Sequence, residues 1–257
     1  MDRFFVKEEN IDIENKKMFI EGEDVKHISK VLRYSIGDKL EICDGKNKEY
    51  ICSIADISKN IIELQIEEKV GINRESNIQV VIYQGLPKSQ KMEYILQKLT
   101  ESGVYEIVLV DTKRSIVNLD DKKMDKKFER WERIVYEAAK QCKRGIVPKI
   151  RGILTFDQAI EDMKNNDFNI SPYEEEKSMG IKKILKSDEC RQSMNKEKAK
   201  IGIFIGPEGG FECQENEKIK KSGAKSVAMG PRIFRTETAC VIATAITLYE
   251  LGDIGGN

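Results

Sequence analysis

The stretch IGIFIGPEGGFE, residues 201–212, constrains the fold of this chain more than any other part of its sequence. Apolar residues run directly into Gly-Pro-Glu-Gly-Gly, and a charged segment of helical pattern follows. A strand, a glycine-rich loop and a helix in that order form the layout of a nucleotide-binding turn. The stretch therefore predicts an α/β domain whose loop is a candidate binding site.

The surrounding sequence repeats the same alternation. Residues 77–85 predict a buried strand, Pro87 opens a helix that Gly103 closes, and residues 104–110 predict the next strand. A strand, a helix and a strand in succession indicate a parallel sheet. Further strands are expected at 202–205 and 226–229, with helices at about 122–142 and 212–222. The last helix, TETACVIATAITLYEL, has so little polar surface that it must be buried on several sides, in a tucked-in tail or a subunit interface.

Residues 1–72 have a different pattern. Short alternating or β-branched segments are separated by turn signals such as Asp44-Gly45, and one helix-like piece runs from Glu23 to Arg33. This predicts a small β-barrel with one helix, and the pattern changes near Gly71-Ile72-Asn73. We therefore expect two domains, residues 1–72 and 73–257. Residues 165–200 are mostly charged and predict a surface excursion with some helix.

Composition narrows the function classes. The 257 residues carry 44 basic and 44 acidic side chains, so the chain is not a general polyanion binder. Residues 112–150 hold 12 basic against 6 acidic residues, whereas residues 1–72 hold 12 against 16, so any nucleic-acid surface must be a local patch. No membrane span or signal peptide is evident, which predicts a cytoplasmic protein. Six scattered cysteines without a C-x-x-C predict free thiols, and a single histidine disfavours zinc sites, so no metal is expected.

The glycine loop does not match the phosphate-binding motifs. It lacks the lysine of a Walker loop and the G-x-G-x-x-G of a dinucleotide site, and Glu208 would repel phosphate oxygens. A ligand without phosphates that carries a cationic centre fits better, and S-adenosylmethionine is such a ligand. The alternative is an ordinary strand–turn–helix connection with Glu208 in solvent.

A second loop has a similar form. In AMGPRIFRTETAC, residues 228–240, a strand ends at a Gly230-Pro231 turn, and Thr236 is a plausible N-cap for the last helix. Arg232 and Arg235 could contact RNA phosphate or hold a base. The alternative is that they pair with Glu208, Glu212 or Glu237 in weak surface ion pairs.

Taken together, IGPEGGFE and MGPRIFRTETA resemble the RsmE family of 16S ribosomal RNA uridine-N3 methyltransferases, within the SPOUT (trefoil-knot) superfamily. Five further stretches are similar to that family: HISKVLRYSIGD, KMEYILQKLTESGV, RSIVN, RWERIVYEAAKQCKRGIVPKI and ISPYEEE. Phe234 stands where leucine is usual, Cys142-Lys143 where a small residue and glycine are usual, and residues 177–200 resemble nothing in particular. The departures leave both loops intact.

The resemblance implies the fold, the cofactor and the partners. It implies a C-terminal SPOUT α/β trefoil-knot methyltransferase domain with a parallel sheet, an N-terminal PUA-like β-barrel that binds RNA, and a homodimer. The substrate would be 16S ribosomal RNA or the small ribosomal subunit particle. The cofactor would be S-adenosylmethionine, bound in the two loops by Gly206, Pro207, Glu208, Gly209, Gly210, Met229, Gly230, Ile233, Phe234 and Thr236.

For catalysis, Arg232 and Arg235 are the candidates that would stabilise negative charge on the uracil. A charge-paired Glu208 or Glu237 would be a poor general base, so no base is assigned. The candidate RNA contacts are Arg3, Arg33, Lys88, Lys91, Arg114 and Arg144.

Three alternatives differ in function. A knotted methyltransferase could act on a ribose 2′-OH or on tRNA, although such relatives generally lack the GPRIFRTETA loop. A non-catalytic RNA-binding assembly factor would have no reason to keep the glycine loop. A nicotinamide-dependent oxidoreductase is disfavoured by the missing fingerprint and by Glu208.

Overall fold

The computed structural model describes residues 1–71, 73–115 and 121–256. The chain forms two compact units, one of Met1–Glu75 with Tyr136–Val147, the other of Ser76–Val135 with Pro148–Asn257. Residues 136–147 thus group with the N-terminal unit, while the division into domains of residues 1–72 and 73–257 stays a prediction. Of the RSIVN stretch, residues 116–118 lie outside the described part. No helix in the described ranges has the length and apolar character of a membrane span.

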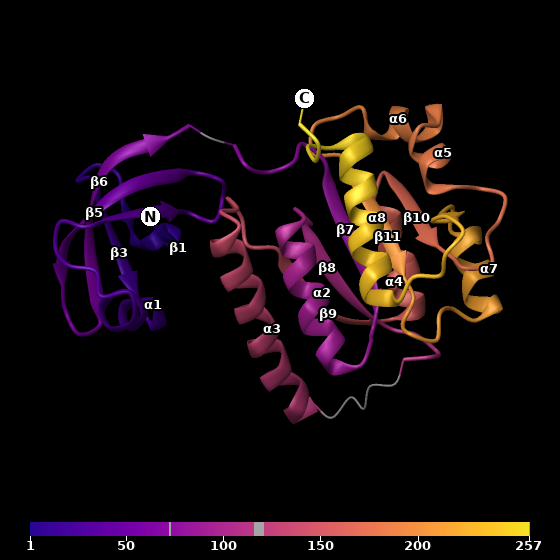
Figure 1. Ribbon diagram of the computed structural model, residues 1–257, viewed down its shortest axis with the longest axis horizontal. Helices are drawn as coiled ribbons and strands as arrows, with labels where there is room; N and C mark the ends of the chain where they lie inside the picture. Colours follow the sequence, from indigo (N-terminus) through magenta and orange to yellow (C-terminus); the bar gives the residue numbers. More distant parts are fainter. Residues whose placement is uncertain (72, 116–120, 257) are drawn as a thin grey trace. The chain divides into compact units, whose positions relative to one another are not determined.

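The N-terminal unit is built on a six-stranded sheet of order β1-β4-β5-β6-β3-β2. β1 pairs with β4 in parallel, and the other neighbours are antiparallel. Register shifts between β5 and β6 accompany the curl of the sheet (Figure 1). The strands are β1 (Arg3–Phe5), β2 (Ile11–Asp12), β3 (Lys17–Glu21), β4 (Lys39–Cys43), β5 (Glu49–Ile57) and β6 (Ile61–Val70).

The helix expected at Glu23–Arg33 is shorter and changes its winding. A 3₁₀ turn, η1 (Glu8–Asn10), precedes it, α1 covers only Glu23–Lys26, and η2 (His27–Val31) continues as a π-helical turn. Ile28 is fully buried beneath the sheet with the other apolar residues of this unit. Arg33 then takes the left-handed conformation with φ +59°, which ends the helical winding.

The C-terminal unit is built on a six-stranded sheet of order β12-β10-β11-β7-β8-β9, and every pair of neighbours is parallel. The α/β class with a parallel sheet is therefore confirmed. The chain visits the sheet out of order, since β11 inserts between β10 and β7. The strands are β7 (Gln79–Gly85), β8 (Glu106–Asp111), β9 (Lys149–Thr155), β10 (Phe168–Pro172), β11 (Lys200–Ile205) and β12 (Lys225–Val227).

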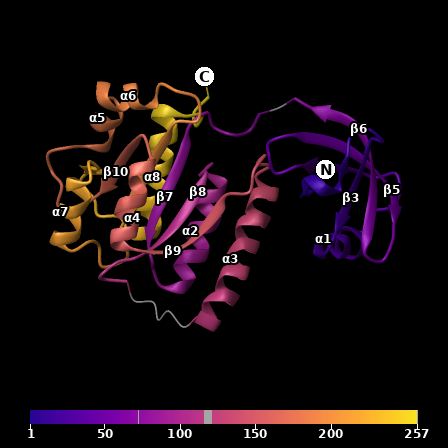
Figure 2. The ribbon, with the colours of Figure 1, turned by 180° about the vertical axis from the view of Figure 1, so that it is seen from behind.

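Helices cover both faces of this sheet. On one face α8 packs against α2, β7 and β11, and on the other lie α4 and α7 (Figures 1 and 2). Apolar residues of α4 and α7 share a buried cluster with Tyr83, Phe204 and Phe211. Successive apolar side chains along β7 and β11 point to opposite faces of the sheet and pack against the helices on each face. The helical segments are α2 (Ser89–Glu101), α3 (Asp121–Gln141), α4 (Phe156–Asp162), η3 (Met163–Asn165), α5 (Ile181–Leu185), α6 (Asp188–Met194), α7 (Cys213–Lys221) and α8 (Thr236–Leu251).

Residues 165–200 contribute more to the core than their charge predicts. They contain β10, which lies between β11 and β12, and the two short helices α5 and α6. Ile181, Leu185 and Cys190 are buried, and α5 packs against α8. The charged residues of this stretch lie on the outer faces of α5 and α6 and in the loops around them.

Candidate functional site

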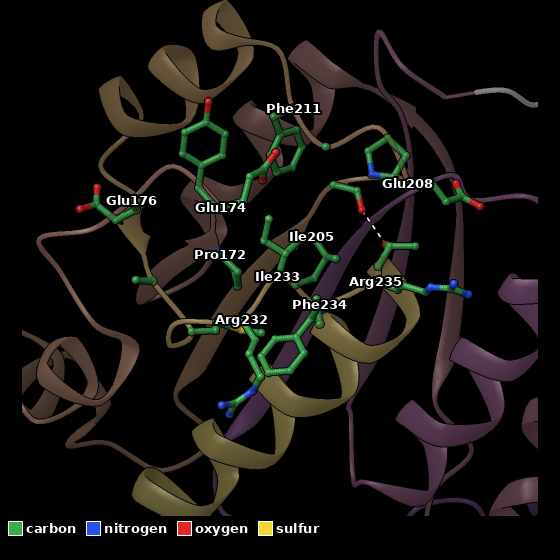
Figure 3. Close-up of a pocket in the computed structure, with 18 of the residues that line it drawn as sticks. Pro172, Glu174, Glu176, Ile205, Glu208, Phe211, Arg232, Ile233, Phe234 and Arg235 are labelled. Carbon is green, nitrogen blue, oxygen red and sulfur yellow. Dashed lines mark hydrogen bonds between the residues drawn. The ribbon is translucent and has the colours of Figure 1, made fainter.

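A cavity of about 430 Å³ lies at the carboxyl ends of β10, β11 and β12, three neighbouring strands of the parallel sheet. The loops that follow these strands form its walls, at residues 173, 174 and 176, at 206–211 and at 228–235 (Figure 3). The lining also includes Lys91 of α2 and Thr236 and Ala239 of α8. Carboxyl ends of parallel strands, at a point where the strand order departs from the chain order, are where open α/β sheets bind ligands.

The turn after β11 depends on one glycine in the loop, Gly210, and on one at the end of the neighbouring strand, Gly85. Gly210 has φ +66°, a conformation that side chains rarely adopt, and its N–H donates to the Pro207 carbonyl at 3.0 Å. Pro207 also packs tightly on the end of β7, where a Cβ on Gly85 would lie 2.7 Å from the Pro207 Cδ. The loop is therefore a fixed turn supported by the neighbouring strand.

A hydrogen-bond relay joins this loop to the last helix. The Thr236 hydroxyl donates to the Gly206 carbonyl at 2.6 Å and accepts from the buried Gln84 amide at 3.0 Å. The relay thus links the ends of β7 and β11 to the start of α8. Thr236 is the first residue of α8 rather than its N-cap, and Arg235 stands at the N-cap without a side-chain cap.

Glu208 at the middle of the loop is already charge-compensated. Its Oε1 accepts from the Lys88 N–H at 3.1 Å and lies 3.5 Å from Lys91 Nζ, which also lies 3.1 Å from Oε2 of Glu237. Burial favours the neutral acid, but hydrogen bonds from Lys88 and from its own N–H, with the Lys91 charge, hold the pKa of Glu208 below its usual value. Figure 3 shows the carboxylate pointing away from the other labelled side chains.

The opposite flank of the loop is held by the turn after β8. Arg114 donates from Nη1 to the Gly209 carbonyl at 2.6 Å. The Lys113 N–H donates to Glu215 of α7 at 2.9 Å, and Glu215 also accepts from the N–H of Glu212 in a capping box. The loop and the helix that follows it are therefore held from both sides, so the cavity wall is preorganised.

Arg232 and Arg235 project from the loop after β12 with exposed side chains. Neither side chain has a hydrogen bond or an ion pair within the described part of the chain, so the alternative pairing with Glu208, Glu212 or Glu237 does not occur there. Lys91 contacts Glu208 and Glu237, and Glu212 caps α7. The two guanidinium groups point to different sides of the cavity (Figure 3). Both are therefore available to a ligand or substrate.

The cavity collects every residue that the sequence indicated for the cofactor, together with both candidate catalytic arginines. Their roles stay predictions. The floor is apolar, with Ile205 and Phe211 buried, whereas Ile233 on the loop after β12 is 84% exposed. The lining residues that came from the sequence are Gly206, Pro207, Glu208, Gly209, Gly210, Met229, Gly230, Arg232, Ile233, Phe234, Arg235 and Thr236.

Sequence reasoning missed the third wall. Pro172, Tyr173, Glu174 and Glu176 line the cavity after β10. The ISPYEEE stretch, residues 170–176, contained the signal, because neighbouring parallel strands end at the same edge of a sheet. What was not evident was that β10 lies next to β11.

The candidate RNA contacts fall into two groups. Arg33 and Lys88 are exposed, and Lys91 and Arg114 contact the glycine-loop region. Arg3 and Arg144, by contrast, are only 3% and 4% exposed. Arg3 forms a bidentate ion pair with Glu49 and donates to the carbonyls of Lys143 and Arg144, so its charge and both of its terminal nitrogens are engaged inside the N-terminal unit.

Arg144 has the same structural role as Arg3. Its guanidinium donates to both oxygens of Glu75, at 3.2 Å from Nε and 2.5 Å from Nη2. The same carboxylate accepts from the N–H groups of Gly145 and Ile146. The expectation that Arg3 and Arg144 face RNA therefore does not fit their burial.

One group of side chains has the spacing of metal ligands. Asp24, His27 and Glu137 bring a ligand atom each to within 4.8 Å of one another in the N-terminal unit. However, the Lys140 ammonium lies 3.0 Å from Asp24 and 3.4 Å from Glu137, and the Tyr136 hydroxyl also donates to Asp24. A buried lysine supplies the positive charge that a cation would bring.

Two family models match this chain. An RNA methyltransferase domain matches residues 74–248, and an RNA methyltransferase PUA domain matches residues 20–67. The first coincides with the parallel sheet and the cavity, the second with the curled sheet. The expected fold class, an α/β trefoil-knot methyltransferase domain with an N-terminal PUA-like domain, is confirmed.

Relatives match along nearly the whole length. Ribosomal RNA small subunit methyltransferase E of Bacillus subtilis is 36% identical over 251 residues, covering 97% of each chain. The protein of the same name from Buchnera aphidicola of Acyrthosiphon pisum is 33% identical, covering 96% of this chain and 92% of the relative. The crystal structure of ribosomal RNA small subunit methyltransferase E from Neisseria gonorrhoeae bound to S-adenosyl methionine superposes with a TM-score of 0.85 at 26% identity, covering 99% of each chain.

Proposed function

This chain belongs to the ribosomal RNA small subunit methyltransferase E family, and from that premise we propose that it methylates N3 of a specific uridine in the decoding region of 16S ribosomal RNA. It is an S-adenosylmethionine-dependent RNA methyltransferase. We base this proposal on the cavity at the ends of β10, β11 and β12, which has a fixed glycine loop on one wall and, on another, two arginines without a side-chain partner among the described residues.

The residues present fit S-adenosylmethionine. The cavity has an apolar floor for the adenine and backbone groups of two loops for its polar edge. The two ends of the glycine loop lie so close together that a Cβ on Gly206 would be 3.2 Å from the backbone of Gly210. The cofactor supplies an electrophilic methyl group on a sulfonium. We assign its binding to Gly206–Gly210 and to Met229, Gly230, Ile233, Phe234 and Thr236.

The arginines would act on the uracil. N3 becomes nucleophilic only when its proton is lost, and the resulting negative charge spreads onto the two carbonyl oxygens. Arg232 and Arg235 can donate to these oxygens, because neither guanidinium has a partner in the described part of the protein. Reaching the cavity requires the base to leave its stack.

Neither nearby carboxylate suits the role of general base. Glu208 and Glu237 both pair with Lys91, and the pKa of Glu208 lies below its usual value. A carboxylate with a lowered pKa accepts a proton poorly at neutral pH. We therefore propose that the arginines promote ionisation of N3 by stabilising the anion.

The RNA contacts divide according to burial. We propose that Lys88 and Arg33 contact RNA phosphate, because both are exposed, and that Lys91 and Arg114 adjoin the RNA while holding the glycine loop. The PUA-like domain, residues 1–72, would bind 16S ribosomal RNA or the small ribosomal subunit particle. The methyltransferase domain would be residues 73–257.

We further propose that the protein is a cytoplasmic homodimer. α8 leaves Val241, Ile242, Ala245 and Ile246 only half-buried, and Tyr249 is 69% exposed. An apolar helix face of this kind is typical of a subunit interface. Light scattering should give twice the mass of the 29.4 kDa chain, and a monomer at micromolar concentration would contradict the dimer.

The decisive experiment is mass analysis of nucleosides after methylation of isolated small subunits and of naked 16S ribosomal RNA. The proposal expects 3-methyluridine at one position and dependence on S-adenosylmethionine. Ribose-methylated product, or methylation of tRNA alone, would assign the chain to another target. Absence of S-adenosylmethionine binding in calorimetry would favour a non-catalytic RNA-binding assembly factor.

A further inference from the structure

Three carboxylates line the same cavity, Glu174, Glu176 and Glu208, and two of them are already engaged. Glu208 accepts from the Lys88 N–H and faces Lys91. Glu176 accepts on one oxygen from the Ser178 N–H at 2.8 Å and from the Ser178 hydroxyl at 2.6 Å. These contacts lower the pKa of Glu176, the hydroxyl contributing most. Both groups therefore hold loops in place.

Glu174 differs from both. Its side chain is exposed, and no hydrogen bond or ion pair engages it among residues 1–71, 73–115 and 121–256. Its Oε1 lies 2.7 Å from the position that a Cβ on Gly210 would take, so the absence of a side chain at 210 leaves room for this carboxylate. Figure 3 shows Glu174 beside Phe211 on the wall formed after β10.

We propose that Glu174 is the carboxylate that binds the α-ammonium group of S-adenosylmethionine, an inference that rests on the proposed function. A carboxylate without an ion-pair partner, in a cavity that takes a cationic ligand, gains a charge-assisted hydrogen bond on binding. The charge of Glu208, by contrast, is already compensated, because its Oε1 accepts from the Lys88 N–H and faces the Lys91 ammonium. The negative charge that the sequence indicated in this pocket is thus supplied from the loop after β10 rather than from the glycine loop.

The reaction itself argues for the ammonium rather than the sulfonium. The positive charge on sulfur disappears as the methyl group leaves, so a carboxylate at the sulfur would stabilise the reactant more than the transition state. The ammonium charge does not change during transfer, and a contact there lowers KM without slowing the chemical step. Glu174 is therefore a binding residue, and its loss should raise KM and leave kcat unchanged.

The test is calorimetry of the wild type, Glu174→Gln and Glu175→Gln with three ligands. These are S-adenosylmethionine, S-adenosylhomocysteine, which keeps the ammonium but lacks the sulfonium charge, and 5′-methylthioadenosine, which lacks both. Glu175 is the matched control, because it lies one residue along, is exposed and hydrogen-bonds Tyr173 instead of lining the cavity. Glu174→Gln should bind the first two ligands about tenfold more weakly, about 1.4 kcal/mol, and the third as the wild type does.

The outcomes separate the inference from the proposed function. Unchanged affinity of Glu174→Gln for S-adenosylmethionine overturns the inference, as does a loss for S-adenosylmethionine without one for S-adenosylhomocysteine. An equal loss for 5′-methylthioadenosine also overturns it, since the substitution would then have altered the shape of the pocket. If the wild type binds neither S-adenosylmethionine nor S-adenosylhomocysteine, the proposed function fails instead.

Discussion

Arginines in the two units of this protein lie in opposite environments, although nothing in their local sequence distinguishes a buried arginine from an exposed one. In the N-terminal unit, Arg3 is buried and its guanidinium contacts Glu49 and two backbone carbonyls. In the loop after β12, Arg232 and Arg235 are exposed and have no side-chain partner among the described residues. A buried charge must be paired to be tolerated, whereas a charge meant for a substrate must stay unpaired until the substrate arrives.

The largest expected effect is on stability. Arg3→Met leaves the nearly buried Glu49 without its bidentate partner and should reduce the free energy of unfolding by about 3–5 kcal/mol. Denaturant unfolding measures it, with Arg33→Met as the control at an exposed position that should shift stability by less than about 0.5 kcal/mol. Equal stability of both variants would remove the contrast between the two kinds of arginine.

The next effect is on catalysis alone. Arg235→Ala should lower kcat by about 100-fold or more, because it removes a donor to the developing negative charge, and should leave the unfolding transition unchanged. Single-turnover methyl transfer to small subunits measures the loss of rate, and thermal unfolding measures the stability of the variant. Wild-type turnover by this variant would exclude the arginine from the mechanism.

A smaller effect is expected for an uncharged group whose hydrogen bonds are satisfied, the hydroxyl of Thr236. Thr236→Val keeps the β-branched shape but removes the hydroxyl that joins Gln84 to the Gly206 carbonyl, at a cost of about 1–3 kcal/mol in stability. Affinity for S-adenosylmethionine should fall as well, because the glycine loop loses a support. Thr238→Val, two residues along α8, is the control, and a parallel loss there would show that the helix rather than the relay was disturbed.

The smallest effect concerns pH. The pKa of Glu208 is lowered in the folded protein, so its stabilisation is present above its ordinary value of 4.5 and is lost as pH falls through the lower folded-state value. Because the group is partly exposed, the contribution should stay below about 1 kcal/mol. Glu208→Gln should therefore flatten the acid side of the stability profile slightly, and Glu197→Gln, at an exposed position, should not. Superimposable wild-type and Glu208→Gln profiles below pH 5 would contradict the lowered pKa.

Much of the fold could be predicted from local sequence patterns. The apolar runs at 77–85 and 104–110, and the helix that follows Pro87, appear as β7, β8 and α2, because burial on both faces and helical periodicity are visible along the chain. The charged stretch 165–200 shows the limit of this approach. Its few apolar residues, such as Ile181 and Leu185, are buried by α8, which is distant in sequence.

Two glycine-bearing loops that follow strands, and the arginines within the second of them, could be predicted from the sequence, since turn chemistry and strand patterns are local. How the charges are paired follows from the folded arrangement alone. That arrangement set Lys91 against Glu208 and Glu237, enclosed Arg3 and Arg144 with glutamates, and left Glu174 and the two loop arginines without partners among the described residues. Charge pairing depends on distances of a few ångströms between side chains whose segments are far apart in the sequence, and no local pattern encodes such distances.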